Sequence, residues 1–239
     1  MGSKRTTAQW QELDASQHLH PFTDFNDYQK NHGRIIERAE HIYIYDTDGK
    51  QMLDAMSGLW CCSLGYSQPE IADAVHAQFQ QLPYYNNFFQ CSNTPAGELA
   101  DQLVKMTPEQ VTHVFFTNSG SEANDTNIRL IRRYWDIKKQ PKKRNILART
   151  NAYHGSTIAA ASLGGFEFVH NQFETLPYAQ HIIDPNWYNN GAHLTADEFG
   201  LLAARELEKR IDQLGEENVA AFIAEPIQGA GGVIVPPDS

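Results

Sequence analysis

The first part of the chain consists of short apolar runs that turn residues separate. Its predicted elements are a helix over residues 7–17 and strands over residues 34–36, 41–45 and 51–54. Residues 46–49 (Asp-Thr-Asp-Gly) have turn composition and lie between the last two strands, which favours a hairpin there. The pattern therefore predicts a small antiparallel unit at the amino end.

From about residue 68 onward, helical periodicity alternates with apolar strand-like runs. Predicted helices cover residues 69–81, 95–106, 121–138 and 196–213, with a further helix from residue 156, and predicted strands cover residues 112–117, 145–149 and 219–224. Thr94 and Thr195 stand where helix caps are expected, and Glu198 completes a capping box with Thr195. This alternation argues for an α/β fold with a mainly parallel sheet whose two faces are covered.

The composition argues against several kinds of partner. Hydrophobic residues make up 41% and charged residues 20% of the chain, as in ordinary globular proteins, and the formal net charge is -10. A negative balance of this size disfavours nucleic acid and anionic membrane surfaces. No apolar run approaches the ~20 residues of a membrane span, and no secretory-type segment opens the chain, so we expect a cytoplasmic protein.

Cysteine and histidine give no sign of a metal centre. Cys61, Cys62 and Cys91 lack the spacing of metal ligands and fit reduced thiols. Among the scattered histidines, His18 and His20 are closest together, and a surface pair is the expected interpretation. We therefore predict no metal site.

Three polar segments that contain glycine each follow a predicted strand. They are residues 117–125 (TNSGSEAND), 151–155 (NAYHG) and 224–232 (AEPIQGAGG). In a parallel sheet, ligands bind beyond the carboxyl ends of the strands, which is where all three segments are expected. Together they predict half of a pocket for a cofactor that carries a phosphate.

The first segment has the features of a phosphate cradle. A tight turn at residues 118–120 leads into a helix, and the step from Gly120 to Ser121 leaves backbone N–H groups free and adds a hydroxyl. The helix dipole strengthens such a site for an anion. The alternative is an ordinary capped helix in which Ser119 or Ser121 is merely the cap.

The other two segments carry an aromatic ring and a carboxylate. Tyr153 can present a flat ring to a flat ligand, and Gly155 lets the backbone turn sharply beside it. The alternative is a tyrosine packed on the sheet edge, with His154 in a structural role. Glu225 ends the last strand, where a carboxylate is costly unless it is paired or functional. A solvated strand end is the alternative there.

These segments closely resemble those of the class III aminotransferases, enzymes of fold type I that use pyridoxal phosphate (PLP). The likeness runs from residues 21–24 to residues 232–237. It implies that residues 1–67 belong to the small domain of that fold. It also implies that residues 68–239 form the first part of the large, PLP-binding domain.

The resemblance implies a role for each of the residues singled out above. Gly120 and Ser121 are implied to hold the PLP phosphate, and Tyr153 is implied to stack on the pyridine ring. Glu225 is placed beside the cofactor and the substrate.

The resemblance also assigns a set of apolar and aromatic residues to the substrate pocket. They are Phe22, Leu59, Trp60, Phe88 and Phe89. The phenylalanine pair is implied to reach in from the neighbouring subunit, so a homodimer with shared active sites is expected. Ordinary core or interface packing is the alternative for most of these side chains.

Within the family, the sequence is most similar to the branch that moves amino groups from ω-amines to pyruvate, the putrescine–pyruvate aminotransferases in particular. Residues 54–61 and 216–232 carry this likeness. It implies that a diamine, an ω-amino acid or another amine is the donor and leaves as an aldehyde. Pyruvate then becomes alanine.

The resemblance also implies that part of the catalytic machinery is missing. In the family, the lysine that carries the cofactor as a Schiff base lies further along the chain than Ser239, and none of the lysines present stands where that one should. A truncated chain without activity of its own is therefore expected. Two alternatives stay open, namely an aminomutase of the same fold, and a catalytically dead remnant that binds a phosphate ligand or a full-length subunit.

Overall fold

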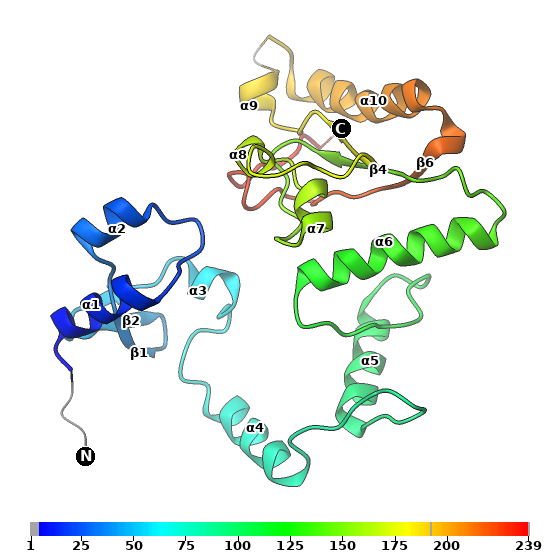
Figure 1. Cartoon of the computed structure of the whole chain (residues 1–239). Helices are drawn as coiled ribbons and strands as arrows, with labels where there is room; N and C mark the ends of the chain where they lie inside the picture. The colour runs from blue at the N-terminus through cyan, green and yellow to red at the C-terminus, as the bar shows by residue number, and fades with distance from the viewer. Residues whose placement is uncertain (1–4, 192, 239) are drawn as a thin grey trace. The chain divides into compact units, whose positions relative to one another are not determined.

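The structure is a computed structural model that describes residues 5–191 and 193–238 (Figure 1). The chain divides into two compact units, an amino-terminal unit (Met1–Gln102) and a carboxyl-terminal unit (Leu103–Ser239). The division expected between residues 67 and 68, for the domains of the whole protein, stays a prediction.

The amino-terminal unit contains the predicted antiparallel sheet, in the strand order β1-β2-β3. Its strands are β1 (Ile36–Glu40), β2 (Tyr43–Asp46) and β3 (Gln51–Leu53), and they follow the helices α1 (Thr7–Gln17) and α2 (Phe25–Asn31). The predicted helix over residues 7–17 and the antiparallel unit are confirmed.

The first strand of this sheet begins later than predicted. Residues 34–36 were expected to form it, but the strand is β1, in which Glu40 pairs with Tyr43 and Ile36 pairs with Asp46. Pairing with β2 therefore determines which residues belong to β1. The prediction was wrong because the strand sequence Ile-Glu-Arg-Ala-Glu is mostly polar and resembles a loop.

Three further helices begin in the amino-terminal unit. They are α3 (Ser57–Trp60), α4 (Pro69–Gln81) and α5 (Thr94–Met106). The prediction for α4 is confirmed. Thr94 is the first residue of α5 rather than its cap, because the side chain of Asn93 accepts the N–H of Ala96 at 3.0 Å. No described residue of this unit is buried.

The carboxyl-terminal unit is built on a parallel sheet with the strand order β5-β4-β6. The strands are β4 (Asn145–Arg149), β5 (Ala179–Ile182) and β6 (Val219–Phe222). Ile146 in the central strand pairs with residues of both neighbours. The mainly parallel sheet is confirmed, whereas β5 was not predicted and β6 ends two residues earlier than expected.

Helices cover both faces of this sheet. Figure 1 shows α10 (Ala196–Leu214) on one face, and α6 (Gly120–Ile137) and α7 (Ile158–Leu163) on the other. Three short helices lie in the connections between these elements: α8 (Glu167–His170), α9 (Trp187–Asn190) and the 3-10 helix η1 (Glu216–Asn218). The capping box predicted at the start of α10 is confirmed. None of the helices in the described part of the chain has the length and apolar character needed to cross a membrane.

The apolar run at residues 112–117 forms no strand. Within the described residues it has no ladder partner, and Phe115 and Phe116 are 71% and 42% exposed. Apolar composition alone does not make a strand, because the extended backbone is stabilised by hydrogen bonds to a neighbour. The strand predicted there is therefore wrong for this structure.

The core of the carboxyl-terminal unit is centred on β4. Leu147 and Ala148 are 0% exposed and Ile146 is 2% exposed. Ile146 packs in one cluster with Ile128 of α6 and Leu163 of α7. The core thus fixes α6 and α7 against the strand whose carboxyl end carries the segment NAYHG.

Replacing Leu147 with alanine is expected to lower the free energy of unfolding of the carboxyl-terminal unit by about 3 kcal/mol, because a fully buried side chain leaves a cavity. Leu130→Ala is the matched control, since Leu130 is 57% exposed, and it is expected to cost at most about 0.5 kcal/mol. Urea denaturation followed by circular dichroism measures both. Equal losses for the two variants would contradict the assignment of the core.

Candidate functional site

The three polar segments meet within the carboxyl-terminal unit. Three hydrogen bonds join the first turn of α6 to residues 154–157, which follow β4. Two more join the Glu225 carboxylate, after β6, to the backbone of Tyr153 and Gly229. The structure therefore brings Ser121, Tyr153 and Glu225 to the same end of the sheet.

The turn before α6 shows which serine caps the helix. The side-chain oxygen of Ser119 accepts the N–H of Glu122 at 3.2 Å, which makes Ser119 the N-cap. The Ser121 Oγ accepts instead from the backbone N–H of Ser156, at 2.9 Å. A hydroxyl that accepts one hydrogen bond still has its own hydrogen to donate. Ser121 therefore links two segments and can still donate to an anion.

Gly155 is the residue that permits this contact. Its φ is +130°, a backbone region that L side chains rarely adopt, and a Cβ there would lie 2.5 Å from the Ser121 Oγ and 3.0 Å from the Ser121 Cα. Any side chain at residue 155 would push the loop after β4 away from α6. The close contact is a stronger requirement for glycine than the sharp turn that the sequence predicts at this residue.

Two residues of α6 that have no role predicted from the sequence complete the contact. The Asn124 side chain donates to the His154 carbonyl at 2.7 Å. The Asp125 carboxylate accepts the Thr157 hydroxyl at 2.8 Å. Their spacing could have revealed them, because residues three and four positions after Ser121 lie on the same face of a helix.

Tyr153 and Glu225 lie next to each other at the ends of β4 and β6. One carboxylate oxygen of Glu225 accepts the N–H of Tyr153 at 2.8 Å, and the other accepts the N–H of Gly229 at 3.0 Å. Tyr153 is 41% exposed as a residue, and its ring lies 6.4 Å from the Phe166 ring, centroid to centroid. Glu225 is thus partly buried and hydrogen-bonded rather than a solvated strand end, and the tyrosine ring is open to a ligand.

Two buried polar atoms near these strand ends have no hydrogen-bond partner among the described residues. They are Nε2 of His154 and Oε1 of Gln228. Burial lowers the pKa of His154, although the Glu225 charge acts in the opposite direction. The Gln228 amide nitrogen donates to the Thr150 carbonyl at 2.9 Å. Buried polar atoms without a partner are costly and are expected to meet a ligand or water.

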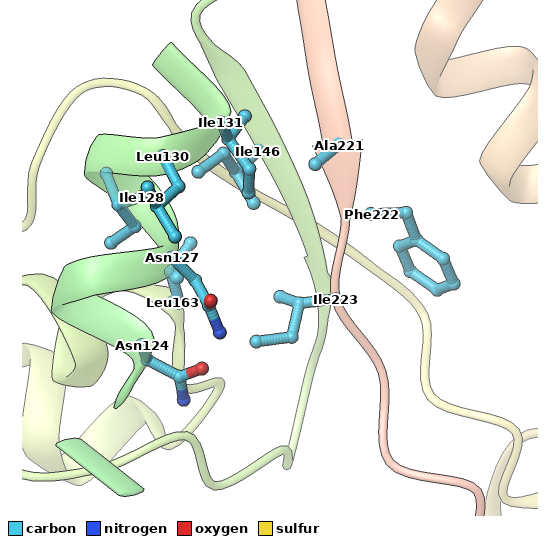
Figure 2. Close-up of a pocket in the computed structure, with 10 residues that line it drawn as sticks. All are labelled: Asn124, Asn127, Ile128, Leu130, Ile131, Ile146, Leu163, Ala221, Phe222 and Ile223. Carbon is cyan, nitrogen blue, oxygen red and sulfur yellow. The ribbon is translucent and has the colours of Figure 1, made fainter. Parts of the chain in front are cut away.

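A separate apolar groove of about 250 Å³ lies between α6 and the sheet (Figure 2). It is lined mainly by aliphatic side chains such as Ile128, Ile146 and Ile223, with Asn124 and Asn127 at its polar end. In Figure 2 the ring of Phe222 points to the other side of β6. Apart from the two asparagines the lining is apolar, so the groove does not suit a phosphate.

The residues expected in the substrate pocket belong to the amino-terminal unit. Leu59 and Trp60 lie in α3, and Phe88 and Phe89 lie between α4 and α5 with their ring centroids 6.1 Å apart. Phe22, Leu59, Trp60 and Phe89 all have φ between 50° and 66°. A positive φ is rare for bulky residues, costs about 1–3 kcal/mol, and clusters at functional sites. Their assignment to a substrate pocket stays a prediction.

The end of the sheet has the chemistry that a phosphorylated, flat cofactor requires. The first turn of α6 presents backbone N–H groups and the positive end of the helix dipole. A Cβ added to Gly120 would meet nothing within 4 Å, so the helix end is open to an anion. The exposed Tyr153 ring supplies a flat surface in the same unit. The residues therefore fit PLP.

The chain is similar to known aminotransferases over almost all of its length. The family model for aminotransferase class III matches residues 25–239. The putrescine–pyruvate aminotransferase of Pseudomonas aeruginosa is 52% identical, over 98% of this chain and 51% of the relative. The chain therefore spans about half the length of that relative.

Solved structures give the same result. An (S)-enantioselective ω-transaminase from Thermomicrobium roseum has a TM-score of 0.95 and 36% identity, over 99% of this chain and 53% of the other. The ω-transaminase of Pseudomonas jessenii, solved in complex with PMP, has a TM-score of 0.92 and 42% identity, over 95% of this chain and 51% of the other. With the strand-end motifs in place, these matches show that the chain belongs to the class III aminotransferases, a family of PLP-dependent enzymes.

Proposed function

We propose that this chain supplies the phosphate-holding and ring-stacking part of a PLP site in an aminotransferase. The enzyme moves an amino group from a diamine, an ω-amino acid or another amine to pyruvate. The observation that carries the proposal is the docking of the first turn of α6 on residues 154–157, with the Ser121 hydroxyl between them. The similarity to a putrescine–pyruvate aminotransferase supports the choice of substrates.

Gly120 and Ser121 act as the phosphate cradle in this proposal. Their backbone N–H groups open α6 and face an anion with the helix dipole behind them. The Ser121 hydroxyl adds a donor, because it accepts the N–H of Ser156 and its own hydrogen stays available. Phosphate binding therefore needs no cationic side chain at this point.

Tyr153 and Glu225 position the ring. Glu225 accepts the backbone N–H of Tyr153 and so ties that residue to the segment after β6. The tyrosine ring then holds a flat cofactor in one plane by stacking. PLP, when bound, supplies the electron sink for the carbon that loses or gains the amino group.

The lysine that carries the cofactor is proposed to come from outside these residues. In the carboxyl-terminal unit, Lys138, Lys139, Lys142 and Lys143 precede β4, at the opposite end of the sheet from Tyr153. The Lys143 ammonium donates to the Glu216 and Val219 carbonyls at 2.7 and 3.2 Å. Lys209 lies on α10, where it pairs with Glu206. None of these five lysines comes just after a strand of the sheet, where Tyr153 and Glu225 lie.

The remaining parts of the proposal concern the whole protein. It is a cytoplasmic homodimer in which Phe88 and Phe89 of one subunit complete the substrate pocket of the other, while Phe22, Leu59 and Trp60 line the same pocket. The left-handed backbone at four of these five residues supports a functional constraint on them.

The protein at the full length of its relatives is expected to form alanine from pyruvate when putrescine or another primary amine is supplied, and the 239-residue chain alone is expected to form none. The reason is that the chain holds the cofactor but lacks the lysine that moves the proton. Chromatographic measurement of alanine tests both parts. Alanine formation by the 239-residue chain, or its absence from the full-length protein with every amine tried, would contradict the proposal.

Ser121→Asp in the full-length protein is expected to abolish retention of PLP through purification. An aspartate at residue 121 suits the start of a helix, but its charge repels a phosphate dianion in a partly buried site. Ser121→Asn is the matched control, because asparagine has nearly the same size without the charge. Absorbance of bound cofactor measures retention. If the aspartate variant holds as much PLP as the asparagine variant, the phosphate does not lie at Ser121.

Tyr153→Ala is expected to weaken cofactor retention several-fold and to slow turnover, because a stacking contact contributes on the order of 1 kcal/mol. Tyr153→Phe keeps the ring face and is expected to behave like the parent. Cofactor dissociation followed by absorbance, together with the rate of alanine formation, distinguishes the two variants. Parent-like values for the alanine variant would make Tyr153 a packing residue only.

A further inference from the structure

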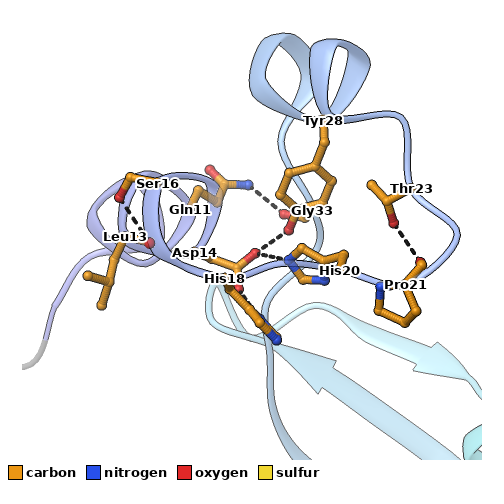
Figure 3. Close-up of polar contacts among 10 residues, drawn as sticks. All are labelled: Gln11, Leu13, Asp14, Ser16, His18, His20, Pro21, Thr23, Tyr28 and Gly33. Atoms are coloured by element: carbon orange, nitrogen blue, oxygen red, sulfur yellow. Dashed lines mark hydrogen bonds and ion pairs between the residues drawn. The ribbon is translucent and has the colours of Figure 1, made fainter.

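The end of helix α1 carries a cluster of polar side chains that the aminotransferase reaction does not use (Figure 3). Asp14 lies in the last turn of α1, and His18 and His20 follow the helix. The His18 Nδ1 lies 3.0 Å from one carboxylate oxygen of Asp14, and the His20 Nε2 lies 2.8 Å from the other. The three ligand atoms all lie within 4.8 Å of one another.

Helix α2 orients the carboxylate from a second direction. The Tyr28 hydroxyl, on α2, donates to the same Asp14 oxygen that His20 approaches. The two histidine rings lie with their centroids 4.2 Å apart. The cluster therefore joins α1, α2 and the segment between them through one anionic group.

The location gives such a cluster a structural purpose. Asp14 is contacted by His18, by His20 and by Tyr28 of α2, so one carboxylate links the end of α1 to α2. A bound ion at this carboxylate would add a further link between the same segments. The cysteines of this unit form no disulfide.

We propose that Asp14, His18 and His20 form a binding site for a zinc ion. Two imidazole nitrogens and one carboxylate oxygen are the ligands that Zn²⁺ accepts, whereas Ca²⁺ and Mg²⁺ prefer a set made of oxygen atoms. His18 stands four residues after Asp14, at the end of the same helix, so both side chains point the same way. Solvent supplies the fourth ligand, because 63% of the His18 side chain is exposed.

Binding replaces the two hydrogen bonds between the histidines and Asp14 with bonds to the ion. Ligand atoms ~2.0–2.2 Å from a tetrahedral zinc ion lie about 3.4 Å from one another, so the two histidine nitrogens move slightly away from the Asp14 oxygens that they now contact at 3.0 and 2.8 Å. The His18 Nδ1 and the His20 Nε2 must both offer lone pairs, which places the ring hydrogens on the opposite nitrogens. The Tyr28 hydroxyl keeps its bond to Asp14 and acts as the group behind the ligand.

Titration of the 239-residue chain, without a polyhistidine tag, with zinc chloride tests the proposal. One ion per chain is expected, measured by competition with a chromophoric chelator. His18→Ala combined with His20→Ala is expected to weaken binding at least about 10-fold, and Tyr28→Phe is expected to weaken it less. His76→Ala is the matched control, because His76 is an exposed histidine on α4, outside the cluster. Equal affinity of the double variant and the control would overturn the proposal.

A second measurement keeps the test decisive if the double variant does not fold. Cobalt(II) replaces zinc in the unaltered chain, and its visible absorption bands report tetrahedral coordination by nitrogen and oxygen ligands. Strong bands that one equivalent of zinc removes would support the site. An octahedral, aqueous-type spectrum in the unaltered chain would overturn it, as would the absence of zinc uptake.

Discussion

The close approach of the loop after β4 to the first turn of α6 is the constraint on which the rest of the site depends. It exists because residue 155 has no side chain, since a Cβ there would lie 2.5 Å from the Ser121 Oγ. Once the two segments are that close, the bonds from Ser156, from Asn124 and from Thr157 all form together. The start of α6, proposed above to hold a phosphate, is thus held against the residues that directly follow Tyr153.

The same hydrogen bonds serve structure and chemistry at once. The Ser121 hydroxyl accepts from the loop, which holds the loop in place, and its own hydrogen is directed away from that donor. Glu225 also links two segments, because its two oxygens accept the backbone N–H groups of Tyr153 and Gly229. Such a site is preorganised, because the core around Ile146 of β4 already holds α6, which carries the donors, in place.

The sequence predicted those helices and strands whose own residues carry the evidence, such as a capping box or an apolar run. The capping box of Thr195 and Glu198 fixed the start of α10, and the apolar run of β4 fixed that strand to the residue. Elements that depend on distant partners were missed. β5 has the unremarkable sequence Ala-Gln-His-Ile and is a strand because it pairs with β4, whereas the apolar residues 112–117 have no described partner and form none.

In the candidate site, too, the features that depend on local sequence could be predicted and the contacts between distant segments could not. The glycine and serine at the start of α6 and the tyrosine after β4 could be singled out from the sequence, because helix starts and strand ends have recognisable residues. The contacts between segments could not, and neither could the role of Asp14 beside His18 and His20. The two histidines could be recognised as a pair in the sequence. The carboxylate that contacts both of them lies about one helical turn before His18, and Tyr28, which donates a hydrogen bond to that carboxylate, lies on another helix.

The arrangement also explains how a chain half as long as its relatives can contain one coherent part of an active site. Holding a phosphate needs backbone N–H groups, a hydroxyl and a helix dipole, and segments that are neighbours in a three-stranded parallel sheet supply all of them. Moving a proton between carbon atoms needs a basic side chain at a strand end. The four lysines between α6 and β4 lie at the amino end of the sheet, where Lys143 is bonded to carbonyls. In the function proposed above, the described residues therefore contribute to binding, and the basic group has to come from elsewhere in the protein.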